Sequence, residues 1–220
     1  MKPTVEKDNR PDCPVGETQC PIIDELMMLR QLARTDPLTG LFNSRHFRDA
    51  LLQEIERTQR QGQPTSLMFV DLDFFKKVND THGHEVGNTA LKHLADLLVN
   101  NLRRLDIPCR YGGEEFVVIL PGTDLYTGKF VAERIRSLIE SSPVPLAKGE
   151  LRLTASIGID TYRSEDQDTP DAFVARTDAL LYQAKAEGRN RVVHGVADLT
   201  TEAKISADEK AALSDLFTKR

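Results

Sequence analysis

Long apolar segments are missing from this sequence. No stretch approaches the roughly 20 apolar residues that a helix needs to cross a bilayer, and segment 1–19 is polar, without the apolar core of a signal peptide. We therefore expect a cytoplasmic protein with no membrane contact. Positive charge is not in excess either, because 29 Lys and Arg stand against 34 Asp and Glu, a net charge of -5. General nucleic-acid binders usually carry a basic face, so we expect no nucleic-acid partner.

Cysteine is scarce, with three residues at positions 13, 20 and 109. An odd number in an intracellular chain favours free thiols over a disulfide framework. Cys13 and Cys20 could pair or share a metal, but two ligands without a nearby histidine are a weak metal pattern. Two reduced thiols in a loose arm are the simpler interpretation. Cys109 stands among apolar residues and is expected in the core.

The composition is that of a folded domain, with 40% hydrophobic and 29% charged residues among 220. We expect an arm and a short dimerising helix over residues 1–35, one main domain over 36–195, and a tail with a terminal helix over 196–220. In the first part, coiled-coil spacing relates Ile22, Leu26, Leu29 and Ala33. This seam is either a dimerising stalk or a helix face that packs on its own domain.

Hydrophobic periodicity predicts helices that alternate with strands. Helical stripes occur over residues 44–60, 87–103, 124–140 and 171–187, and apolar strand patterns over 66–71, 151–159 and 191–194. The strict alternation within 151–159 predicts one buried face. Gly112-Gly113, between segments 110–111 and 116–120, predicts a β-hairpin. The order predicts an α/β fold in which helices flank a central mixed sheet.

Asp71 ends an apolar strand, at the kind of position where open α/β sheets bind ligands. A carboxylate there suits Mg²⁺ together with substrate phosphates, and Lys76 adds a positive charge. The ordinary alternative is an acidic helix cap.

Three other groups have ordinary explanations when each is taken alone. Segment 110–116 could be a polar hairpin turn, Lys185 and Arg189 could be helix-end cations, and Arg103 with Asp106 could be a surface ion pair. In the functional interpretation, Gly112 and Gly113 allow a ligand to approach the backbone closely. The two basic residues could likewise clamp a phosphate.

Together these motifs resemble the GGDEF family of diguanylate cyclases. The strongest signature is Arg110–Phe116, which has the GGEEF form, and segments 36–43, 71–80, 83–87 and 184–190 accompany it in the family's order. The resemblance covers about residues 36 to 194. It implies a nucleotidyl-cyclase-like fold and identifies 36–195 as a catalytic domain. The implied reaction condenses two GTP into cyclic di-GMP and releases two pyrophosphates.

The resemblance also implies the site residues. Two divalent ions per active site, Mg²⁺ or Mn²⁺, would be held by Asp71, the Leu72 carbonyl and Glu114. The substrate-binding residues would be Phe74, Phe75, Lys76, Asn79, Asn88, Gly112, Gly113, Lys185 and Arg189. The catalytic residues would be Glu115, Glu114, Lys76 and Arg110, with Glu115 beside the ribose to assist activation of the 3′-hydroxyl.

Guanine recognition involves one departure from the family pattern, since many members have Asp where this chain has Asn88. Asn keeps a carbonyl acceptor and adds a donor, so guanine can still be recognised. A mixed GMP-AMP product is a minor alternative.

Regulation and assembly also follow from the resemblance. Arg103 and Asp106 match the family's RxxD product-inhibition site, and Arg134 resembles an arginine that a dimer partner contributes to it. Each domain would hold one GTP, so the resemblance implies a homodimer. The alternative function is a catalytically inactive domain that senses cyclic di-GMP or GTP.

Overall fold

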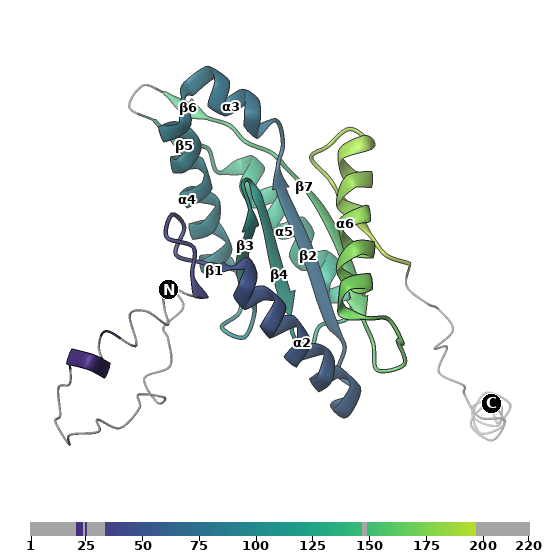
Figure 1. Cartoon of the computed structure of the whole chain (residues 1–220). Coiled ribbons are helices and arrows are strands. Elements are labelled where there is room, and N and C mark those ends of the chain that lie inside the picture. The colour runs from purple at the N-terminus through teal and green to yellow at the C-terminus, as the bar shows by residue number, and fades with distance from the viewer. Residues whose placement is uncertain (1–20, 24, 26–33, 147–148, 197–220) are drawn as a thin grey trace, which may run out of the picture.

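The structure, a computed structural model, describes residues 21–23, 25, 34–146 and 149–196 (Figure 1). Cys13, Cys20, most of the predicted dimerising helix and the predicted tail helix lie outside these ranges. No helix within the described ranges is both long and apolar enough to cross a bilayer.

A six-stranded mixed sheet forms the centre of the molecule. Its order is β1 (Phe42–Asn43), β3 (Ile107–Gly112), β4 (Glu115–Leu120), β2 (Thr65–Leu72), β7 (Ala155–Tyr162) and β8 (Val192–His194). The two edge pairs, β1 with β3 and β7 with β8, are parallel, and the inner pairs are antiparallel. The prediction of a mixed sheet with a hairpin at Gly112-Gly113 is therefore confirmed.

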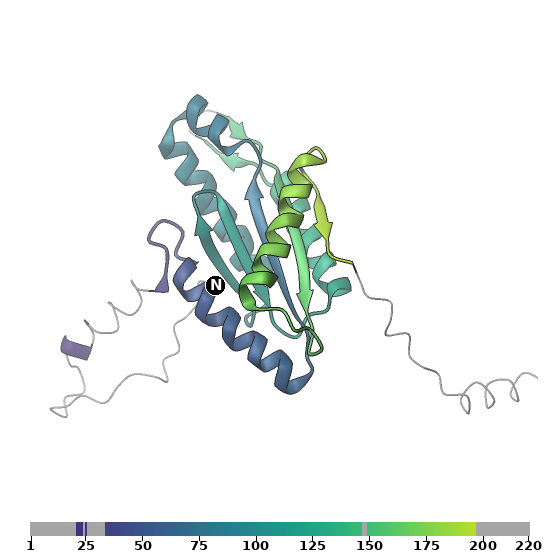
Figure 2. The same ribbon diagram turned by 45° about the vertical axis from the view of Figure 1, so that its right-hand side comes forward.

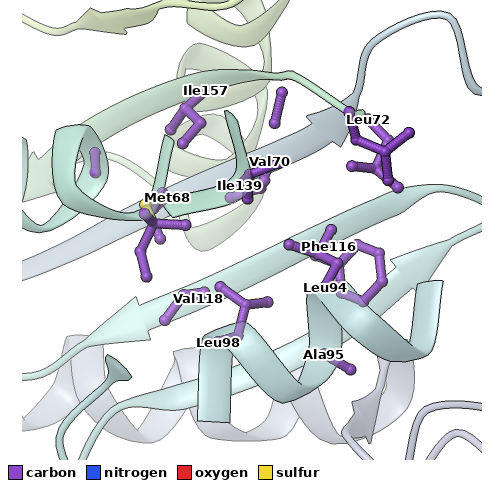
Figure 3. Close-up of a cluster of buried hydrophobic side chains, with 14 of the residues drawn as sticks. Met68, Val70, Leu72, Leu94, Ala95, Leu98, Phe116, Val118, Ile139 and Ile157 are labelled. Atoms are coloured by element: carbon purple, nitrogen blue, oxygen red, sulfur yellow. The ribbon is translucent and has the colours of Figure 1, made fainter. Parts of the chain in front are cut away.

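Helices cover both faces of this sheet. Figures 1 and 2 show α2 (Ser44–Gln61) and α6 (Pro170–Ala186) in front of it, with α5 (Leu125–Ser141) behind. α5 and α4 (His84–Asn101) pack on the sheet face that carries Met68, Val70 and Leu72 (Figure 3). The alternate residues Leu67 and Phe69 face α2 and α6. Every residue of β2 is buried, as its continuous apolar run predicts.

Side-chain caps define where the main helices begin. Asn43, Asp124 and Thr169 each accept a hydrogen bond from a first-turn amide of α2, α5 and α6 respectively. Gly62 ends α2 in the left-handed conformation that glycine adopts without strain. Cys109 is a buried free thiol, as predicted.

The structure corrects several predicted elements. The strand predicted over 151–159 is confirmed over residues 155–159, but its predicted start and its single buried face are wrong. β7 runs from Ala155 to Tyr162, and residues 155–159 are all buried because α5 and α6 both pack on this strand. Leu151 belongs instead to a small hairpin of β5 (Val144–Pro145) and β6 (Glu150–Leu151). An additional short helix, α3 (Phe75–His82), precedes α4, which begins earlier than predicted.

Candidate active site

Asp71 lies near the end of β2, opposite Glu115 of β4 in the antiparallel ladder. Its carboxylate is buried and pairs with Lys185 of α6, whose Nζ is 2.8 Å from Oδ2. Burial raises the pKa of Asp71 to about 6 against the opposing effect of Lys185, and the nearby charges of Glu114 and Glu115 add to the rise. The ionised form is therefore poorly solvated and would be stabilised by a cation.

The β3–β4 turn brings its acidic residues to the same end of the sheet (Figure 1). A register shift between Arg110 and Gly112 distorts β3 just before the turn, and such irregularities re-aim neighbouring side chains. Arg110 donates to Gly113 O at 2.8 and 3.0 Å. It also donates to both carboxylate oxygens of Asp36 at 3.1 Å. Arg110 thus fixes the turn that carries Glu114.

The start of α3 offers main-chain donors beside Asp71. Phe74 precedes the helix in a left-handed conformation, with φ 56°, and no side chain caps the helix. Its first-turn amides therefore lack the usual side-chain partner and can bind an anion such as phosphate. Phe75 is buried as an anchor, while Lys76 is exposed. This arrangement suits the predicted roles of these three residues.

Asn79 of α3 packs closely against α4 at Gly87, the residue before Asn88. A Cβ placed on Gly87 would lie only 1.9 Å from Asn79 Oδ1 and 3.2 Å from Phe75 Cζ. The Asn79 side chain therefore lies directly against the α4 backbone next to Asn88. Asn79 is half-buried and Asn88 is exposed, and their role in guanine recognition stays a prediction.

The segment after α6 brings Arg189 to the start of α3. The Arg189 guanidinium lies 4.6 Å from the centre of the Phe74 ring. The preceding turn of α6 carries Lys185, which reaches Asp71. Two cations predicted to bind phosphate thus flank the end of β2.

Comparison with known proteins agrees with this geometry. The family model described as "Diguanylate cyclase, GGDEF domain" matches residues 33–191. The chain belongs to the GGDEF family. Response regulator PleD of Caulobacter vibrioides is 48% identical over 165 residues, which are 74% of this chain and 36% of PleD. Diguanylate cyclase DgcP of Pseudomonas aeruginosa is 42% identical over 163 residues, 74% of this chain and 24% of DgcP. The chain thus spans only about a quarter to a third of these relatives.

Solved GGDEF structures share the fold. Diguanylate cyclase SiaD of Pseudomonas aeruginosa, solved with its activator SiaC, has a TM-score of 0.72 and 39% identity, covering 79% of this chain and 66% of SiaD. The structure of the coiled coil and GGDEF domain of DgcB from Caulobacter crescentus, solved with c-di-GMP, has a TM-score of 0.74 and 28% identity. The match covers 79% of this chain and 92% of the DgcB chain.

The donor set of this GGDEF domain fits a divalent cation. Among the described residues, no group of three or more His, Cys, Asp or Glu side chains forms a complete cage. Asp71, the Leu72 carbonyl and Glu114, the predicted ligands, would instead supply a few hard oxygens. Mg²⁺ typically binds in this way, with its remaining ligands from water and substrate phosphates.

The residues predicted for product inhibition lie at the opposite end of β3 from the GGEEF turn. Asp106 is buried and accepts a hydrogen bond from the Arg103 amide at 2.7 Å. Burial raises its pKa, while Arg103 and Arg134 act in the opposite direction, so both arginines lie near it. Arg134 donates to Asn101 O at 2.7 Å.

Sequence reasoning gave no role to two acidic residues that organise this site. Asp36 anchors Arg110, and Asp73 accepts hydrogen bonds from Ser156 of β7 and from Asn190, the residue after Arg189. Asp73 stands two residues after Asp71, which was the one available signal. Its partners lie more than 80 residues away in the chain.

Proposed function

We propose that this GGDEF domain is a diguanylate cyclase that converts two GTP into cyclic di-GMP and two pyrophosphates. The observation that carries the proposal is the ion pair of buried Asp71 with half-buried Lys185, since Asp71 lies opposite Glu115 of the GGEEF motif. An acidic group for a cation and a basic group for phosphate thus meet where the uncapped start of α3 can bind the same triphosphate. Relatives named as diguanylate cyclases support this assignment.

In this mechanism the 3′-hydroxyl of one GTP attacks the α-phosphorus of the other, and the bond to pyrophosphate breaks. Asp71, the Leu72 carbonyl and Glu114 would hold two Mg²⁺ or Mn²⁺ ions, which polarise the phosphate and acidify the attacking hydroxyl. Glu115 is the candidate to accept the hydroxyl proton. The negative charge of the triphosphate is neutralised by Lys76, Lys185 and Arg189. Most of the rate gain is therefore expected from positioning and charge stabilisation.

One domain supplies only half of the reacting pair. Because each domain binds one GTP, the two active sites of a homodimer must face each other during the reaction. The direct test of the function is to strip bound nucleotide, add GTP and Mg²⁺, and identify the product by mass. Cyclic di-GMP is expected, whereas binding of nucleotide without any dinucleotide product would indicate a sensor.

We expect Gly87→Ala to weaken GTP recognition. The added methyl would overlap Asn79 Oδ1 and force this side chain away from the guanine edge. The loss of one hydrogen bond predicts an increase in KM for GTP on the order of 10-fold. Steady-state kinetics checks this, with the exposed Thr89→Ala on the same helix as control. An unchanged KM in a folded variant would remove Asn79 from the recognition site.

We further propose that cyclic di-GMP inhibits the enzyme at Arg103, Asp106 and Arg134. Arg103→Ala is expected to leave the initial rate similar and to raise the half-inhibitory concentration of added cyclic di-GMP about 10-fold or more, because a bidentate contact to guanine is lost. The neighbouring exposed Arg104→Ala is the matched control. Equal inhibition of both variants and the wild type would refute this site.

A further inference from the structure

Asp73 is a buried acidic residue that the proposed reaction does not use. Its side chain accepts hydrogen bonds from Thr154 Oγ1 at 2.7 Å, Ser156 Oγ at 2.6 Å and the Asn190 amide at 3.0 Å. Both carboxylate oxygens therefore have protein donors. This arrangement differs from that of Asp71, which forms an ion pair with the ammonium group of Lys185. Asp73 is thus arranged to hold other segments.

The segments that Asp73 holds have an unusual backbone. Among the described residues, three non-glycine residues have positive φ: Phe74 at 56°, Arg189 at 64° and Asn190 at 46°. Phe74 follows Asp73 directly, and Asn190 donates to it. Non-glycine residues adopt this conformation rarely and keep it only where surrounding contacts hold them, which occurs often at functional sites.

Asn190 is fixed from a second direction by α5. Its Oδ1 accepts from Arg136 Nη1 at 2.8 Å, and its Nδ2 donates to Glu140 Oε1 at 2.8 Å. The turn is therefore tied to the sheet through Asp73 and to α5 through the Asn190 side chain. Arg189 directly precedes Asn190, and its guanidinium lies over the Phe74 ring.

We propose that Asp73 is a positioning residue for the cyclase reaction, which acts through Arg189. By accepting from the Asn190 amide, it holds the left-handed turn that directs the Arg189 guanidinium toward the triphosphate. The proposal rests on the function proposed above and adds to it a residue that touches neither substrate nor cation. Loss of a residue that supports a metal ligand typically costs about 10- to 100-fold in affinity or activity, and we expect a cost of the same order for this support of Arg189.

A double-mutant cycle tests this coupling. Asp73→Ala and Arg189→Ala are each expected to raise KM for GTP about 10-fold, and the double variant should resemble Arg189→Ala alone. When one residue acts through another, the free-energy effects of the two substitutions do not add in the double variant. If the two effects multiply instead, Asp73 does not act through Arg189. Thermal unfolding is measured beside each variant, and Asp73→Ser replaces Asp73→Ala if the latter does not fold.

The conservative variant Asp73→Asn separates positioning from metal binding. Its amide oxygen can accept from the Asn190 amide and Thr154, while its NH₂ donates to the Ser156 hydroxyl, so a KM near the wild-type value is expected. A loss as large as that of Asp73→Ala would show that the charge itself is needed and would overturn the proposal. If the wild-type protein makes no cyclic di-GMP, the proposed function fails, and the same cycle is measured as Kd for a non-hydrolysable GTP analogue.

Discussion

Glu114→Ala is expected to reduce the rate of cyclic di-GMP formation on the order of 1,000-fold. Glu114 occupies the β3–β4 turn, where its charge adds to the burial that raises the pKa of Asp71, and in the proposed mechanism both carboxylates bind the cations. Removing Glu114 would leave Asp71 as the one carboxylate that binds the cations which stabilise the transition state. Loss of one such preorganised group commonly lowers the rate about 100- to 1,000-fold. Product formation is measured under saturating GTP and Mg²⁺.

The fold should survive this substitution, because Glu114 is only half-buried in a turn that Arg110 holds through the Gly113 carbonyl. An unchanged unfolding temperature is therefore expected. Glu150→Ala, at an exposed position of β6, is the matched control and should keep the wild-type rate. A Glu114→Ala variant as active as this control would contradict the assigned role.

Gly158→Ala is expected to lower the free energy of unfolding by about 3 kcal/mol, the upper part of the range for overpacking a core. A Cβ at this position of β7 would lie 2.3 Å from Leu181 N and 2.7 Å from Thr177 O. These are backbone atoms of α6, so the helix itself must move. Because α6 carries Lys185, we expect cyclase activity to fall as well. Urea unfolding measures the loss of stability.

The matched control for that variant is Gly62→Ala. Gly62 also has a special conformation, with φ +71°, but no atom lies within 4 Å of an added Cβ. It should therefore show only the backbone cost of about 1–2 kcal/mol. If Gly158→Ala unfolds at the same urea concentration as the wild type, α6 does not pack against β7 as closely as described.

The long elements could be predicted because local pattern and tertiary packing agree. The helix expected over 44–60 is α2 at Ser44–Gln61, and the apolar run ending at Asp71 is the buried strand β2. The burial of both faces of β7 was missed because Ser156 and Gly158 carry no strong apolar signal, although Ser156 is fully buried and Gly158 lies against the α6 backbone. The helix α3 has a single buried residue, Phe75, so it lacks the stripe by which helices are found.

The motifs of the candidate site could likewise be found in the sequence, but not the contacts that hold them. The ion pair of Asp71 with Lys185 joins residues from two separate motifs. The tie between Arg110 and Asp36 spans 74 residues, and that between Asp73 and Asn190 spans 117. No local periodicity reports contacts of this kind, because they arise only when the sheet assembles.

The central claim is that Asp71 and Glu114 hold cations beneath a nucleoside triphosphate. Anomalous diffraction from a crystal grown with Mn²⁺ and a non-hydrolysable GTP analogue tests it most directly. We predict a manganese peak at bonding distance, about 2.0–2.2 Å, from carboxylate oxygens of both residues and adjacent to the phosphates. Phosphates bound there with no ion between the two carboxylates would contradict the account.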